Sequence, residues 1–189
     1  MYAWSPNQSS KRKSRFRGFS TPARRFQRRR HSLYSRSNDV FFRANRPVVL
    51  GPGEGTHLDV LGDLITLLVS GNQTNGAFTV LSETSPPGGG TPLHTHHNED
   101  EALYVLQGEY EIQCGEQTVR ARAGAFVFAP REIPHRLTNV SSGPSTVLGI
   151  VSPAGFEGFW EEVSQLPPPP DIDQILAIAK KYRLEIHTP

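Results

Sequence analysis

Four side chains in the middle of the chain have the types and spacing of a metal site. His94 and His96 are two residues apart, so in an extended segment both imidazoles leave the same face, whereas His97 leaves the other. Glu101 follows a short polar stretch that can turn the chain and bring a carboxylate back onto the two imidazoles. His135 offers a third nitrogen from far along the chain.

This donor set suits one divalent transition metal ion: Fe, Mn, Ni, Cu, Co or Zn. Four protein ligands leave two positions open on a six-coordinate ion, and open positions are typical of catalytic sites. Taken singly, each residue also has an ordinary structural role. A His-x-His pair often decorates a surface, and a lone buried histidine is more often a hydrogen-bonded core residue than a ligand.

Short apolar runs separated by Gly, Pro and Asn predict the strands that must position these ligands. Such spacing indicates a β-sandwich or barrel. The run 125–129 is apolar on both faces, which predicts a central strand. The expected strands are Leu64–Val69, Ala77–Ser82, Ala102–Leu106, Glu109–Cys114, Thr118–Ala123, Ala125–Ala129, His135–Val140 and Thr146–Val151.

Beyond Pro153 the apolar period becomes helical. Residues 156–166 follow a helical spacing, and four prolines at 167–170 interrupt it. Asp171 can cap a second helix, with Gln174 completing a capping box. Both helices are expected to pack on the sheet or on a partner subunit, with a lid role as the alternative.

The N-terminal quarter differs in charge from the rest of the 189-residue chain. Residues 1–46 hold 13 Lys/Arg and one acid, which leaves 7 bases and 17 acids for residues 47–189. This basic stretch lacks apolar periodicity and is predicted to be a disordered tail. It is interpreted as a solvated tail, an over-extended start, an organelle transit peptide or a nonspecific nucleic-acid contact.

Composition also bears on the compartment. The single cysteine, Cys114, cannot form an internal disulfide, and no apolar run approaches the roughly 18 residues of a membrane span. A cytoplasmic protein without a membrane segment is therefore expected, with organelle targeting as the alternative.

The combined spacing resembles the cupin superfamily. The first cupin motif is filled as Gly88-x5-His94-x-His96-x4-Glu101-x6-Gly108. The second is filled as Gly124-x5-Pro130-x-Glu132-x2-His135-x3-Asn139. The one departure is Glu132, which stands where the motif has glycine in the turn after Pro130.

The resemblance implies an all-β fold: a single jelly-roll β-barrel with a short C-terminal helical extension. The expected domains are a basic tail over 1–46, the cupin barrel over 47–155 and the extension over 156–189. The resemblance also implies that His94, His96, Glu101 and His135 hold the metal inside the barrel.

Longer blocks at 76–81, 92–106, 124–130 and 151–160 resemble the single-domain cupins grouped with quercetin 2,3-dioxygenase. This similarity implies a dioxygenase that opens a flavonol or other enolic small molecule with O2. Glu101 is then both a ligand and the catalytic base. A metal-dependent isomerase or decarboxylase, and a noncatalytic metal- or ligand-binding module, remain the alternatives. A homodimer is expected, through an edge strand and the two amphipathic helices.

Strand alternation predicts which side chains share the inner faces with Glu101 and His135. Arg120, Arg122 and Arg136 fall on outer faces, so no cation is expected to face a substrate phosphate. The wall is therefore expected to be apolar, which favours an apolar or aromatic substrate, or one bound mainly through the metal. The residues expected inside are Leu103, Val105, Val119, Ala121, Ala123, Leu137 and Asn139.

Overall fold

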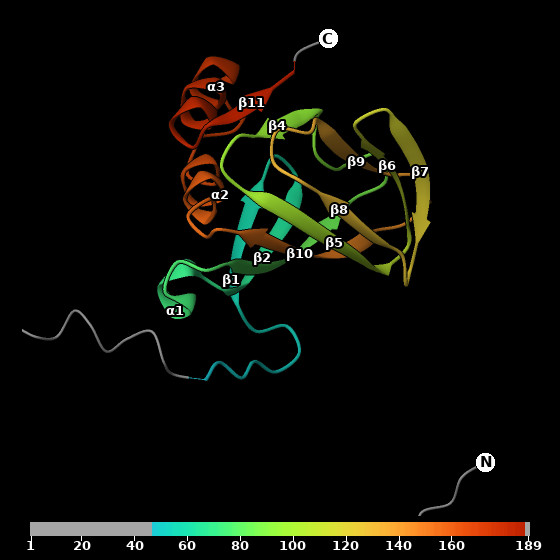
Figure 1. Ribbon diagram of the computed structural model, residues 1–189, viewed down its shortest axis with the longest axis horizontal. Coiled ribbons are helices and arrows are strands. Elements are labelled where there is room, and N and C mark those ends of the chain that lie inside the picture. The colour runs from blue at the N-terminus through green and yellow to red at the C-terminus, as the bar shows by residue number, and fades with distance from the viewer. Residues whose placement is uncertain (1–46, 188–189) are drawn as a thin grey trace, which may run out of the picture. The chain divides into compact units, whose positions relative to one another are not determined.

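A computed structural model of the chain describes residues 47–187. They form two antiparallel sheets that close into a jelly-roll barrel, with helices at one end (Figure 1). The expectations for residues 1–46 lie outside the described part. No helix within 47–187 is long and apolar enough to cross a bilayer.

The strands are β1 (Thr56–Val60), β2 (Asp63–Val69), β3 (Thr79–Ser85), β4 (His94–His96), β5 (Asp100–Gln107), β6 (Glu109–Cys114), β7 (Gln117–Arg122), β8 (Phe126–Ala129), β9 (His135–Asn139), β10 (Ser145–Ser152) and β11 (Leu184–Ile186). The helices are α1 (Gly71–Thr74), α2 (Glu157–Val163) and α3 (Ile172–Lys181). One sheet has the order β1-β2-β3-β10-β5-β8 and the other β11-β4-β9-β6-β7. All eight expected strands are present, and β1, β4 and β11 are additional.

The prediction that residues 125–129 form a central strand is wrong. β8 is the last strand of the six-stranded sheet, and among the described residues its one partner is β5. Ala129 is buried in the barrel, whereas Phe126 and Phe128 point outward and are more than half exposed. Apolarity on both faces predicts burial on both sides, but one of the two apolar faces of β8 is an exposed outer surface.

The expected burial of Val119 and Ala123 is also wrong. β7 is an edge strand of the five-stranded sheet, and Ala121 is the residue of this strand that reaches the core. Val119 is 45% exposed, and Ala123 lies beyond the strand in the turn toward Gly124. The other residues expected inside are buried: Leu103, Val105, Ala121, Leu137 and Asn139.

Two motif residues serve the fold. Gly108 has a φ of 79°, and a Cβ there would collide with the Ser145 side chain, so glycine is required. Asn139 is fully engaged, because its Nδ2 donates to the carbonyls of Ser85 and Gly143 while its Oδ1 accepts from Ser145 Oγ at 2.7 Å. This amide joins three segments at the end of β9 without approaching the metal site.

The C-terminal extension belongs to the barrel core. α2 buries Phe159, Trp160 and Val163 against β1, β2 and β3, and α3 contributes Ala179 to the same cluster. Asp171 caps α3 by accepting from the backbone N of Asp173 at 3.0 Å. The chain then returns as β11, which pairs with β4 and was not expected within this extension.

Candidate metal centre

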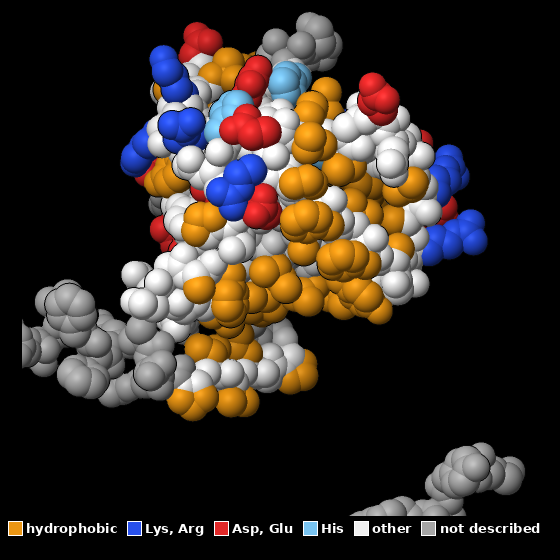
Figure 2. Space-filling view, viewed as in Figure 1, with side chains coloured by type: hydrophobic (Ala, Val, Ile, Leu, Met, Phe, Trp, Pro, Cys, Tyr) orange, Lys and Arg blue, Asp and Glu red, His pale blue; other side chains and the backbone are white. Residues whose placement is uncertain are grey.

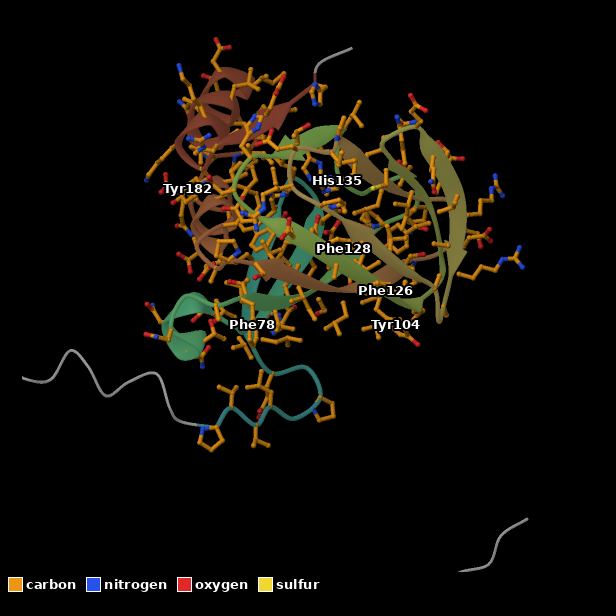
Figure 3. All side chains as sticks on the ribbon, in the orientation of Figure 1. Phe78, Tyr104, Phe126, Phe128, His135 and Tyr182 are labelled. Atoms are coloured by element: carbon orange, nitrogen blue, oxygen red, sulfur yellow. The ribbon has the colours of Figure 1, made fainter. Side chains whose placement is uncertain are left out.

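The four side chains of the predicted site come together between the two sheets. His94 and His96 lie on β4, His135 on β9, and Glu101 on β5 of the opposite sheet. Each offers one ligand atom, and these atoms lie within 4.8 Å of one another. All four are buried, and Figure 3 shows His135 inside the barrel. Glu101 Oε2 is 3.0 Å from His135 Nε2.

Each imidazole has an oxygen atom near its Nδ1. His94 Nδ1 contacts the carbonyl of Pro92 at 2.8 Å, and His135 Nδ1 contacts that of Ile133 at 2.9 Å. His96 Nδ1 lies 3.4 Å from Glu99 Oε2, and neither of these two buried atoms has a hydrogen bond. Such outer oxygens favour the proton on Nδ1 and leave Nε2 free to coordinate.

The electrostatics fit a cation between these groups. Burial, with the neighbouring His135 and His96, lowers the pKa of His94 to about 3, so this ring is neutral and able to coordinate. Burial alone would raise the pKa of Glu101, but the His135 hydrogen bond and the three imidazoles outweigh it and hold the pKa near 2. Glu101 in turn outweighs the burial of His135 and raises its pKa. The donor set therefore suits a divalent transition metal.

His97 lies outside the cluster, as strand alternation predicted. Its Nδ1 contacts Glu132 Oε2 at 2.7 Å on the outer side of the sheet. Glu132, at the motif's glycine position, has a φ of 66°. A left-handed backbone costs a residue with a Cβ about 1–2 kcal/mol. The turn nevertheless keeps its place, because the Glu132 N–H donates to the carbonyl of His96 at 2.8 Å.

A small cavity of about 90 Å³ opens beside the cluster. One wall is apolar and comes mostly from the C-terminal extension: Phe156, Phe159, Trp160, Ile175, Leu184 and Ile186. The other holds two buried carboxyl groups, Asp63 and Glu83. No Lys or Arg lines the cavity within the described chain. The expected apolar wall is therefore present on the side formed by the C-terminal extension. The opposite side is polar, because Asp63 and Glu83 line it.

Glu83 and Asp63 were not singled out by sequence reasoning. Glu83 lies on β3 two residues beyond the inward-facing Leu81, so alternation would have turned it inward had the strand been extended past Ser82. Its Oε1 accepts a 3.3 Å hydrogen bond from Ser85. Burial and the nearby carboxyls of Asp63 and Glu101 raise the pKa of Glu83 to about 8. The cavity thus contains a carboxyl group that stays protonated at neutral pH.

Residues 81–151 match a family model described as "Cupin domain". A Bacillus subtilis quercetin 2,3-dioxygenase is 28% identical over 114 residues, which cover 60% of this chain and 34% of that protein. An uncharacterized protein of Methanocaldococcus jannaschii is 27% identical over 88 residues, 46% of this chain and 70% of the relative. The match thus spans about a third of the Bacillus protein's length.

Solved structures support the same fold. An RmlC-like cupin from Shewanella frigidimarina aligns with a TM-score of 0.52 and 17% identity, over 60% of this chain and 96% of the other. A predicted oxalate decarboxylase from Thermotoga maritima aligns with a TM-score of 0.50 and 24% identity, over 55% and 97%. With the motifs, the barrel and the family match in agreement, residues 81–151 form a cupin domain.

Proposed function

We propose that this cupin is a metal-dependent dioxygenase acting on a small enolic substrate. The observation that carries the proposal is a buried cluster of three imidazoles and one carboxylate beside a cavity with an aromatic wall. His94, His96, Glu101 and His135 would hold the ion. The likeness to a quercetin 2,3-dioxygenase supports the reaction class. When bound, the ion supplies Lewis acidity and a meeting point for the substrate oxygen and O2.

The residues of the chain supply the proton chemistry. Glu101 is ionised and in contact with His135, so its carboxylate can take the proton of a substrate hydroxyl that approaches the same point. The aromatic wall excludes water from the deprotonated substrate. Glu83, which carries a proton at neutral pH, offers a donor from the opposite side of the cavity.

The cavity also restricts the substrate. Drug-sized ligands occupy pockets of roughly 300–1,000 Å³, and this cavity measures about 90 Å³. A small enol therefore fits the barrel as it stands, whereas a flavonol requires α2 and α3 to move. Two carboxyl groups, with no Lys or Arg among the described lining residues, disfavour phosphates and dicarboxylates. This composition weighs against a sugar-phosphate isomerase and an oxalate-type decarboxylase.

An oxygen electrode tests the proposal. Protein purified without added metal is analysed for its elements, loaded with the metal found, and screened with small enols before flavonols. One O2 consumed per substrate, without an external reductant, is the expected result. CO2 release or isomerisation without O2 uptake would support the alternative enzymes. Metal binding without any turnover would support a noncatalytic module.

Substitution of Glu101 separates the base from the ligand. Glu101→Gln keeps a coordinating oxygen but removes the charge and the base, so turnover by metal-loaded protein should fall by roughly 10²-fold or more. Glu111→Gln, a carboxyl group on the outer face of β6, is the matched control and should leave the rate unchanged. Full turnover by metal-loaded Glu101→Gln would show that Glu101 is not the base.

A further inference from the structure

Two carboxyl groups line the cavity without belonging to the cluster of three imidazoles and Glu101. Asp63 begins β2 and Glu83 lies on β3, and these residues are 9% and 6% exposed. The pairing of Leu64 with Thr84 places Asp63 opposite the residue after Thr84, which is Ser85. Glu83 is two residues from Ser85 on the same inner face, so the two carboxyl groups are diagonal neighbours in the sheet. We call Asp63 and Glu83 the acid pair.

The acid pair has more hydrogen-bond acceptors than donors. Glu83 Oε1 accepts from Ser85 Oγ at 3.3 Å, and no described residue donates a hydrogen bond to Glu83 Oε2. The same hydroxyl and the N–H of Gly90 are the donors near Asp63. A serine hydroxyl has one hydrogen, so Ser85 serves one carboxyl group at a time. Buried acceptors without donors are costly, so a ligand that brings donors is stabilised there.

The acid pair also lacks a basic partner. The described residues that line the cavity include no Lys or Arg. Figure 2 shows basic side chains on the outer surface instead, over α3 and along β7. Burial raises the pKa of Asp63, and burial together with the charges of Asp63 and Glu101 raises the pKa of Glu83 to about 8. Both directions indicate negative charge in the interior that the protein compensates only weakly.

The remaining wall of the cavity is aromatic. Phe156, Phe159 and Trp160 line it, and the ring centroids are 5.1 Å apart for Phe156 and Phe159 and 4.9 Å apart for Phe156 and Trp160. Aromatic faces attract cations within about 6 Å of the ring, most strongly where water is excluded. Carboxyl oxygens and aromatic rings around one cavity therefore favour a cation that carries hydrogen-bond donors.

We propose that the acid pair is a subsite for a protonated amine, so that the substrate carries an ammonium group. The inference rests on the proposed function, because it takes this cavity as the substrate site. An ammonium group has three N–H donors and can reach both carboxyl groups at once. Glu83 keeps an acceptor oxygen whether or not it carries a proton, so the subsite does not require its ionisation. The substrate class narrows to small enols that bear an amino group.

Other ligands fit the acid pair less well. A carboxylate or a phosphate would meet the charge of Asp63 as a like charge. A hydroxyl group donates one hydrogen and brings no charge, so it satisfies the acid pair only in part. A second metal ion would need more ligands, and within the described residues the one group of three or more ligating side chains is the cluster that contains Glu101.

Titration of the full chain with ethylammonium tests the proposal, with ethanol and acetate as comparison probes of similar size. The protein keeps the metal with which it is purified, and sodium chloride holds the ionic strength constant. Trp160 lines the cavity, so its fluorescence reports occupancy, and a Trp4→Phe background removes the other tryptophan. Ethylammonium should bind with a roughly millimolar dissociation constant, as expected for so small a ligand. Its affinity should exceed that of ethanol or acetate by at least about 10-fold.

Substitution of the acid pair locates the binding. Asp63→Asn/Glu83→Gln keeps the shapes of both side chains and removes the charge, so ethylammonium affinity should fall by about 10–100-fold. Circular dichroism and metal content should stay unchanged. Asp63→Asn alone should lower the affinity by about 10-fold, and it serves as the test if the double variant does not fold. Glu111→Gln, on the outer face of β6, is the matched control and should bind like the wild type.

Three outcomes would each overturn the proposal: no binding of ethylammonium, equal affinity for ethylammonium and ethanol, or wild-type affinity in the folded acid-pair variants. The readout is binding rather than turnover, so this test and that of the dioxygenase fail separately. Ethylammonium binding without O2 uptake on any enol would contradict the dioxygenase and retain the amine subsite. O2 uptake without ethylammonium binding would retain the dioxygenase and contradict the amine subsite.

Discussion

The two ends of the barrel interior are built from the same strands but differ in chemistry. β5 contributes Glu101 to one end and Val105 to the other, and β9 contributes His135 and Leu137 in the same way. At the closed end, apolar side chains pack into one cluster: Leu103, Val105, Tyr110, Ile112, Ala121, Leu137 and Val147. At the metal end, the imidazoles and carboxyl groups meet a cavity that the C-terminal helices cover.

This difference shows how the fold separates stability from chemistry. Burying polar groups costs free energy unless each one has a partner. The metal end contains His96 Nδ1 and Glu99 Oε2 without hydrogen bonds, and Glu83 with a strongly raised pKa. The polar groups buried beside the apolar cluster at the closed end have partners: the Tyr110 hydroxyl donates to the carbonyl of Ser145 at 2.6 Å, and the Asn139 amide oxygen accepts from Ser145 Oγ at 2.7 Å. The closed end therefore stabilises the barrel while the metal end bears the cost of the site.

The largest expected effect concerns a ligand at the metal end. His96→Ala removes one of the three imidazole nitrogens expected to bind the metal. Loss of a group that only hydrogen-bonds to a ligand lowers metal affinity by about 10–100-fold, so loss of a ligand itself should lower the affinity by at least about 100-fold. Elemental analysis after dialysis measures it. His97→Ala, the neighbouring histidine on the outer side, is the matched control and should retain the metal. Equal metal content in the two variants would contradict the assigned ligand set.

A substitution at the closed end should lower the stability of the fold and leave metal binding unchanged. Leu137 is 1% exposed within the apolar cluster, so Leu137→Ala should lower the free energy of unfolding by about 2–5 kcal/mol through lost burial and a new cavity. Urea titration measures this loss. The metal bound per folded molecule should stay unchanged, because Leu137 lies two residues from His135 on the closed side. If Leu137→Ala lost its metal while its free energy of unfolding stayed unchanged, the result would contradict the separation of the two ends.

Sequence reasoning reached the four residues of the buried cluster because their positions follow from strand alternation and motif spacing. His94 and His96 face one way on β4, and His135 pairs with His94 in the sheet register. The cavity wall was harder to predict from sequence. The spacing of Phe156 and Trp160 indicates a helix, but a helical spacing does not show which surface the helix packs against. Residues 125–129 show the same limit, since apolarity does not distinguish a buried face from an exposed apolar surface. Glu83 was missed because the strand was ended three residues early.

Glu83 allows a pH-dependent test of the metal end. Its pKa is about 8 in the fold and 4.5 ordinarily. As the pH rises between these values, the unfolded chain releases a proton that the folded chain keeps, so this group lowers the free energy of unfolding. The full shift corresponds to about 4–5 kcal/mol, and relaxation around the group should reduce it to about 2 kcal/mol.

Glu83→Gln should remove this pH dependence. Between pH 5 and pH 8, metal-free wild type should lose about 2 kcal/mol more of its free energy of unfolding than the variant does, as measured by urea titration at both pH values. Glu111→Gln on the outer face of β6 should behave like the wild type. Parallel pH profiles for Glu83→Gln and wild type would show that Glu83 ionises in the fold as readily as it does in water.

The smallest expected effect concerns Glu99, which is buried beside a ligand without being one. Its carboxylate lies 3.4 Å from His96 Nδ1, and its Oε2 has no hydrogen bond. A carboxylate in this position increases the basicity of the imidazole and fixes its orientation, so Glu99→Gln should weaken metal affinity by about 10-fold. Competition with a chelator of known affinity measures the change. The neutral amide removes a buried charge, so the metal-free variant should be at least as stable as the wild type. An unchanged affinity would mean that Glu99 serves the fold rather than His96.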